Sequence, residues 1–138
     1  MSGFVLDNSV TMRWCFDAGA HAHADQVLEQ LETQRSPAYV PVLWRYEVSA
    51  VLARAEVRGV LAAPKVAEFL KRLAALDIRI DVESAARVLT NVHGLAVRYR
   101  LTSYDAAYLE LALRKDLPLA TLDEELQAAC KAAGVAVL

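Results

Sequence analysis

Short apolar segments alternate with longer amphipathic segments along the chain. The apolar segments have the length of buried β-strands and lie at residues 3–6, 38–42, 78–82, 118–121 and 135–138. Between them, helical spacing of apolar residues predicts helices through Trp14 and Phe16 and over residues 21–35, 43–58, 64–75, 84–92, 103–115 and 123–133. Because such alternation is typical of βαβ units, we expect a parallel sheet with helices on both faces, a three-layer α/β/α fold.

Local signals set the ends of several predicted helices. Gly59 ends one helix, Pro64 stands in the first turn of the next, and Ser84 caps a third. Gly94 interrupts the helical pattern before residues 95–100.

The composition is that of a compact globular protein. The chain has 138 residues, of which 56 % are hydrophobic and 23 % are charged, and this predicts a single domain over residues 1–138. No segment offers about 18 apolar residues uninterrupted by charge, so we expect a soluble, cytoplasmic protein with no membrane partner. Cys15 and Cys130 lie far apart in apolar stretches, which argues against a disulfide and against a zinc site.

Two acidic residues directly follow predicted strands. Asp7 comes after the first strand in "FVLDNSV", and Asp123 comes after the fourth strand in "LATLDEEL". Ligands of parallel sheets bind beyond the carboxyl ends of the strands, which is where both acids are expected. Each acid has an alternative role as a helix cap, and Thr121-x-x-Glu124 has the spacing of a capping box in which Asp123 is the alternative cap.

Glu47 lies on the apolar stripe of its predicted helix, three residues after Trp44 and four before Val51. Burying an unpaired carboxylate costs several kcal/mol or forces it to take up a proton, so something must compensate Glu47. The alternative to a functional role is an ion pair with Arg13 or Arg98.

Asp105 also has apolar residues at its helical neighbour positions, in "LTSYDAAYLELAL". Tyr108 is one of these neighbours, and we expect it to pack in the core, whereas Glu110 and Arg114 are expected on the exposed face. Thr102-x-x-Asp105 has the spacing of a capping box, a role that is compatible with function.

The four acids share one expected location at the carboxyl edge of the sheet. Carboxylates gathered there would repel one another and their pKa values would rise, unless a divalent cation sat among them. Oxygen ligands favour Mg²⁺ or Mn²⁺. The residues predicted to meet at this cation are Asp7, Glu47, Asp105 and Asp123.

The formal net charge of −2 at first argues against a nucleic-acid partner. Setting the four acids aside leaves thirteen acidic residues against fifteen basic ones, a balance of +2, so a phosphate backbone is no longer excluded. Arg98 and Arg100 precede Asp105 and have Tyr99 and Tyr104 beside them, a combination that can hold phosphate and stack a base of RNA. The alternative for the tyrosines is core packing.

With "FVLDNSV", the glutamate of "LWRYEVSAVL", "LTSYDAAYLELA" and "LATLDEEL" in this order, the sequence resembles the PIN-domain ribonucleases, specifically the VapC toxins of bacterial toxin–antitoxin pairs. The resemblance runs from about residue 4 to residue 138. It implies an α/β/α sandwich with a five-stranded parallel sheet. It also implies that Asp7, Glu47, Asp105 and Asp123 correspond to the acidic quartet of the family, with Ser9 and Thr121 as polar support.

The activity implied by the resemblance is hydrolysis of RNA phosphodiester bonds. One or two metal ions held by Asp7 and Asp105, with Glu47 and Asp123 acting directly or through water, would activate a water molecule and stabilise the charge of the transition state. No side-chain nucleophile is required. Members of the family generally form homodimers and are neutralised by a small antitoxin protein.

Other functions fit the sequence less well. A HAD-type phosphotransferase would require a second aspartate where Ser9 stands, and the glycines form no nucleotide-binding loop. The histidines lack a partner set for zinc or for nucleophilic catalysis, and they are His21, His23 and His93.

Two alternatives stay open. One is a non-catalytic α/β interaction module that binds a partner through apolar helix faces such as Val66, Leu70 and Leu73. The other is a PIN nuclease that acts in RNA processing without an antitoxin.

Overall fold

Four parallel strands form the sheet at the centre of the protein. The computed structural model describes residues 2–16, 20–33 and 35–138. Within these residues the strands follow the order β3-β2-β1-β4, and each neighbouring pair is parallel, as predicted. The strands are β1 (Phe4–Leu6), β2 (Ala38–Pro41), β3 (Ile78–Asp81) and β4 (Leu119–Ala120).

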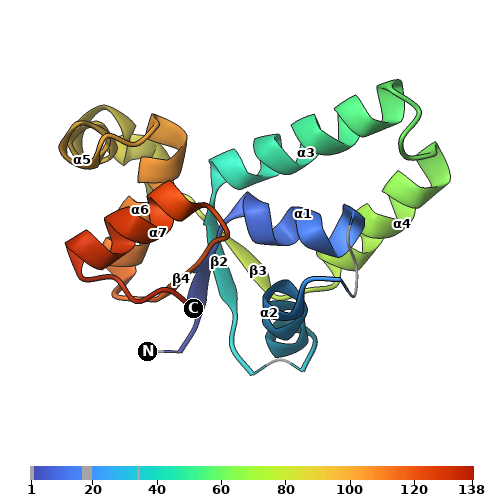
Figure 1. Ribbon diagram of the computed structural model, residues 1–138, viewed down its shortest axis with the longest axis horizontal. Helices are drawn as coiled ribbons and strands as arrows, with labels where there is room; N and C mark the ends of the chain where they lie inside the picture. Colours follow the sequence, from blue (N-terminus) through green and yellow to red (C-terminus); the bar gives the residue numbers. More distant parts are fainter. Residues whose placement is uncertain (1, 17–19, 34) are drawn as a thin grey trace.

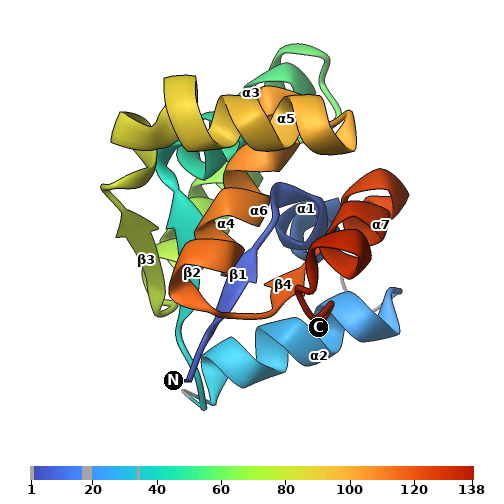
Figure 2. The same ribbon diagram turned by 90° about the vertical axis from the view of Figure 1, so that its left-hand side faces the viewer.

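Helices cover both faces of the sheet. In Figure 1, α1 to α4 lie on one side of the strands and α5 to α7 on the other, and Figure 2 shows α6 crossing in front of the sheet. The helices are α1 (Asn8–Phe16), α2 (Ala22–Glu32), α3 (Val42–Val57), α4 (Ala63–Ala74), α5 (His93–Tyr99), α6 (Ser103–Lys115) and α7 (Glu124–Ala133). No helix in the described ranges has the length and apolar character needed to cross a membrane.

The prediction of a fifth strand at residues 135–138 is wrong. Of residues 135–138, only Val137 forms a bridge, with Leu119, supported by backbone hydrogen bonds from Leu119 N to Ala136 O (2.9 Å) and from Leu138 N to Leu119 O (3.0 Å). β4 is only two residues long, so it offers too short a ladder for a full strand beside it. The sheet therefore has four strands.

The segment between β3 and α5 also differs from the prediction. A 3₁₀ helix, η1 (Ser84–Arg87), and a π-helical segment, η2 (Val88–Val92), lead directly into α5, which runs through Gly94 without interruption. Ser84 does not cap a helix. Its hydroxyl is buried and donates to Asp81 at the end of β3, which fixes the start of this segment against the sheet.

A buried ion-pair network holds β3 against α6. Arg114 contacts Asp81 (2.5 Å) and Glu110 (2.7 Å), and Arg87 lies 3.7 Å from Glu110. Asp81 and Glu110 are buried, and the Arg114 side chain is only 16 % exposed. The prediction that Glu110 and Arg114 form an exposed face is therefore wrong, because this part of α6 is covered by β3 and η1.

Replacing Arg114 should destabilise the protein strongly. Arg114→Met would leave Asp81 and Glu110 buried without their shared guanidinium, and we expect the free energy of unfolding in urea to fall by about 3 kcal/mol. Arg72→Met is the matched control, because the Arg72–Glu32 pair is exposed and its loss should cost less than about 1 kcal/mol. Equal losses in the two variants would contradict a structural role for the buried network.

Candidate active site

The register of β1 and β4 places two of the predicted acids at one edge of the sheet. Leu6 pairs with Ala120, and the backbone N–H of Asp7 donates to the Ala120 carbonyl (3.0 Å). Asp7 follows β1 directly and is 5 % exposed. Asp123 follows β4 and caps α7, with its Oδ1 accepting from Leu126 N (2.9 Å). The cap predicted as an alternative for Asp123 is thus present, and it leaves the second carboxylate oxygen available.

Two hydroxyl groups hold the Asp7 carboxylate. Ser9 Oγ donates to Asp7 Oδ2 (2.6 Å), and Thr121 Oγ1 donates to the same oxygen (2.7 Å). Each hydroxyl oxygen in turn accepts a backbone N–H, from Leu122 to Ser9 (3.0 Å) and from Asp123 to Thr121 (3.1 Å). The hydroxyl protons are therefore directed at Oδ2, and among the described residues no side chain donates to Oδ1.

The other two acids come from helices that start near this edge. Glu47 lies in the second turn of α3, directly after β2, and its Oε1 accepts from the hydroxyl of Tyr108 on α6 (2.5 Å). Asp105 lies in the first turn of α6, where Thr102 caps the helix by accepting from Asp105 N (3.1 Å). The partner of Glu47 is thus a tyrosine hydroxyl rather than the arginine of the alternative ion pair.

The directions of the pKa shifts place Asp7 within electrostatic range of the other three predicted acids. Burial raises the pKa of Asp7, and the charge of Asp123 raises it further. Burial also raises the pKa of Glu47, with added repulsion from Asp7 and Asp105. For Asp105, burial and then the charges of Asp123 and Asp7 raise the pKa to about 6. The four predicted acids therefore lie in one region of the molecule, around Asp7.

The arginines predicted to contact RNA lie on the exposed surface beside α6. Arg98 stacks over the ring of Tyr99, with its guanidinium carbon 5.4 Å from the ring centroid. Arg100 ends α5 in a left-handed conformation, with a φ of 54°. Tyr104 is 63 % exposed, so core packing does not explain it. Tyr108 is fully buried as expected, but its hydrogen bond to Glu47 was not anticipated.

The oxygen-rich donor set fits a hydrated divalent cation rather than an all-protein cage. Among the described residues, no three His, Cys, Asp or Glu side chains are placed to hold a metal ion together. Mg²⁺ usually keeps several waters and binds through one or two carboxylates plus substrate phosphates, an arrangement that needs no third protein ligand. Asn8 follows Asp7, and its Oδ1 is the one buried side-chain atom without a hydrogen-bond partner among the described residues. A buried oxygen of this kind often accepts a hydrogen bond from water or coordinates a cation.

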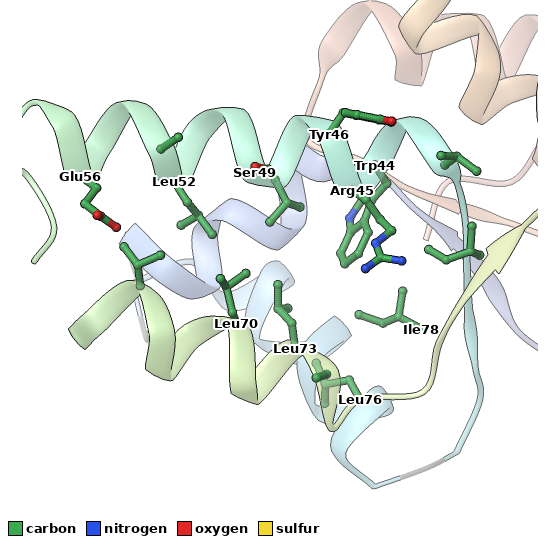
Figure 3. A pocket seen from close by; sticks show the side chains of 16 residues that line it. Trp44, Arg45, Tyr46, Ser49, Leu52, Glu56, Leu70, Leu73, Leu76 and Ile78 are labelled. Carbon is green, nitrogen blue, oxygen red and sulfur yellow. The ribbon is translucent and has the colours of Figure 1, made fainter. Parts of the chain in front are cut away.

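A large groove lies away from the acids. It has a volume of about 780 Å³ and is formed between α3, α4 and the edge strand β3. Leu52 of α3 and Leu70 and Leu73 of α4 point into the space between the helices (Figure 3). A smaller hollow of about 440 Å³ includes one of the four acids, Asp123, and its other lining residues are Ser9, Met12, Arg13, Phe16 and Leu122.

Comparison with known proteins identifies the family. Residues 4–132 match the PIN domain. The chain belongs to the PIN-domain family. The expected resemblance to VapC proteins is also confirmed, because Ribonuclease VapC3 from Pyrobaculum aerophilum is 33 % identical over 98 residues, which cover 71 % of this chain and 75 % of that protein.

Solved structures of PIN-like fold agree with this assignment. The crystal structure of PAE2754 from Pyrobaculum aerophilum matches with a TM-score of 0.67 and 25 % identity, covering 93 % of this chain and 79 % of that one. A toxin–antitoxin complex from Klebsiella pneumoniae matches with a TM-score of 0.61 and 18 % identity, covering 91 % of this chain and 90 % of that one.

Removing the charge of Asp105 should stabilise the metal-free protein at neutral pH. The folded protein holds the Asp105 proton up to a pKa of about 6, whereas an unfolded chain loses it near the ordinary value of 3.8, so stability falls as pH rises between these values. Asp105→Asn has no carboxyl group to ionise, so its stability should not fall over this pH range. Because the carboxyl is partly exposed, we expect a gain of about 1 kcal/mol at pH 7 and none below about pH 4.

Urea denaturation in the presence of a chelator measures this difference. Asp116→Asn is the matched control, because Asp116 is exposed at the end of α6 in a left-handed conformation that Asn tolerates. It should change stability by less than about 0.5 kcal/mol at either pH. If Asp105→Asn instead lowered the free energy of unfolding at pH 7, the claim that burial and neighbouring acids disfavour the charge of Asp105 would be wrong.

Proposed function

We propose that this chain is a metal-dependent ribonuclease that hydrolyses RNA phosphodiester bonds and serves as the toxin of a toxin–antitoxin pair. The observation that carries the proposal is the group of acids at the carboxyl edge of the sheet, where Asp7 lies within electrostatic range of Glu47, Asp105 and Asp123. Neutral hydroxyl groups orient two of these acids, Asp7 and Glu47, without neutralising them. The relation to Ribonuclease VapC3 supports the choice of RNA as the substrate.

Each side chain has a defined role in this reaction. Asp7 and Asp105 would hold Mg²⁺ or Mn²⁺, with Glu47 and Asp123 acting directly or through water. When bound, the cation would lower the pKa of a water molecule and offset charge on the phosphate. Ser9 and Thr121 keep Asp7 oriented by donating to its Oδ2.

The substrate would lie across this edge of the sheet. Arg98 and Arg100 would contact the phosphate backbone on the α5 side, and the hollow beside Ser9 and Asp123 leaves room for the strand on the α1 side. Tyr104 is 63 % exposed and could stack an unpaired base, so we expect cleavage within single-stranded segments. We place this activity in the cytoplasm and in a homodimer.

The antitoxin partner follows from the family relation and from the groove between α3 and α4. The toxin–antitoxin complex from Klebsiella pneumoniae shares the fold of this chain. The groove is lined mostly by apolar side chains and contains residues that the sequence marked as a partner face, namely Val66, Leu70 and Leu73. Leu70 is 46 % exposed, so an apolar segment of the antitoxin could cover it. The groove does not include the acids, so an antitoxin anchored there would suppress cleavage with another part of its chain.

Asp7→Asn should abolish RNA cleavage while the fold is kept. Asn still accepts from Ser9 and Thr121, but it lacks the negative charge that binds the cation, so we expect activity to fall by at least about 100-fold. Cleavage of single-stranded RNA by the wild-type protein should require Mg²⁺ or Mn²⁺ and stop with a chelator. Asp116→Asn should retain full activity. If a folded Asp7→Asn variant cleaved RNA as fast as the wild type, the assignment of Asp7 to the active site would be wrong.

A short DNA-binding protein encoded beside this chain should bind it and suppress its ribonuclease activity. Leu70→Asp places a charge in the groove and should weaken binding of that protein by at least about 10-fold, as measured by calorimetry, while RNA cleavage by the free variant is unchanged. Leu89→Asp is the control, because Leu89 is 88 % exposed and lies outside the groove. Equal binding of the partner to wild type and Leu70→Asp would exclude the groove.

A further inference from the structure

Tyr108 joins the helices that carry two of the acids. Its ring is fully buried in α6, and its hydroxyl donates to Glu47 Oε1 of α3 at 2.5 Å. Glu47 makes no other side-chain hydrogen bond or ion pair with the described residues. Among these residues, no other side-chain hydrogen bond or ion pair connects α3 to α6. A buried tyrosine hydroxyl needs a partner, so ring packing and the Glu47 bond fix each other.

The same hydroxyl also lies near the segment that carries Asp7. The backbone of Asn8, the residue after Asp7, is close enough to counteract part of the rise in the pKa of Tyr108 that burial and the charge of Glu47 cause. Asp105 lies three residues before Tyr108, on the preceding turn of α6. A single phenol group therefore touches or adjoins the elements that carry Asp7, Glu47 and Asp105.

Glu47 depends on this contact for its orientation. A glutamate side chain has three rotatable bonds, and losing their freedom costs up to about 2 kcal/mol unless a partner fixes the group. Glu47 is partly exposed, and its acidic neighbours Asp7 and Asp105 repel it. Without the hydroxyl, repulsion favours rotamers that turn the carboxylate away from the other acids.

We propose that Tyr108 is a positioning residue of the nuclease, whose hydroxyl holds the Glu47 carboxylate beside Asp7 and Asp105. This inference rests on the proposed function, because it assigns Tyr108 a task in that site. Tyr108 does not touch the substrate. It acts through Glu47, as outer partners of metal ligands commonly do.

Tyr108→Phe keeps the buried ring and removes only the hydroxyl. We expect kcat for single-stranded RNA to fall by about 10- to 100-fold, with KM changed by less than about twofold, because RNA contacts are retained. Mn²⁺ binding to the RNA-free protein, measured by titration calorimetry, should weaken by about 10-fold or more. Tyr39→Phe is the matched control, because the Tyr39 hydroxyl pairs with Arg79 outside the site, and it should change none of these values.

A double-mutant cycle with Glu47→Gln tests whether Tyr108 acts through Glu47. In the Glu47→Gln background, Tyr108→Phe should lower kcat by less than about twofold further, since the group that it positions is already altered. The positioning role would be overturned if the two substitutions lowered kcat independently, so that their fold-changes multiplied in the double variant. It would also be overturned if Tyr108→Phe left Mn²⁺ affinity unchanged or lowered the melting temperature by more than about 10 °C. A wild-type chain that neither binds Mn²⁺ nor cleaves RNA would overturn the proposed function itself.

Discussion

Repulsion among carboxylates at the carboxyl edge of the sheet is the constraint on which the site depends. Asp7 is 5 % exposed and has Asp123 as a charged neighbour, and Glu47 and Asp105 add to the same field. The fold keeps these groups together because the ends of β1 and β4 lie near the N-terminal ends of α3 and α6. The packing of the core therefore maintains a concentration of charge that the acids alone would not tolerate.

The protein contains two kinds of buried or partly buried acid, and their partners distinguish them. Asp81 and Glu110 are paired with Arg114, so their charge is neutralised within the fold. Asp7 and Glu47 accept instead from neutral hydroxyls of Ser9, Thr121 and Tyr108. Neutral donors fix the direction of a carboxylate and leave its charge available. This difference separates acids that hold the structure together from acids that are suited to bind a cation.

α3 connects the acidic site with the groove on the other side of the helix. Glu47 lies toward α6, whereas Ser49 and Leu52 of the same helix line the groove that faces α4. The proposed chemistry and the proposed partner surface therefore lie on different faces of one helix. A protein bound in the groove would contact the helix that positions Glu47 without covering the carboxylates themselves.

Much of the site was readable from the sequence, because strand ends in a parallel sheet are local features. Asp7 and Asp123 could be placed from the strands before them, and Glu47 and Asp105 from their positions on apolar helix faces. The helix bounds also followed from local signals, except where tertiary packing intervened, as at Gly94 and Ser84. The fifth strand was overestimated because an apolar segment does not reveal whether its neighbour is long enough to pair with it.

The sequence by itself determined which residues carry the charge and that a parallel sheet would collect them at one edge. Only the tertiary structure decided how each carboxylate is held. The hydroxyls of Thr121 and Tyr108 reach Asp7 and Glu47 across separations of 114 and 61 residues, and Arg114 reaches Asp81 across 33. Such pairings depend on the three-dimensional packing of strands and helices, and the spacing of residues along one element carries no record of them.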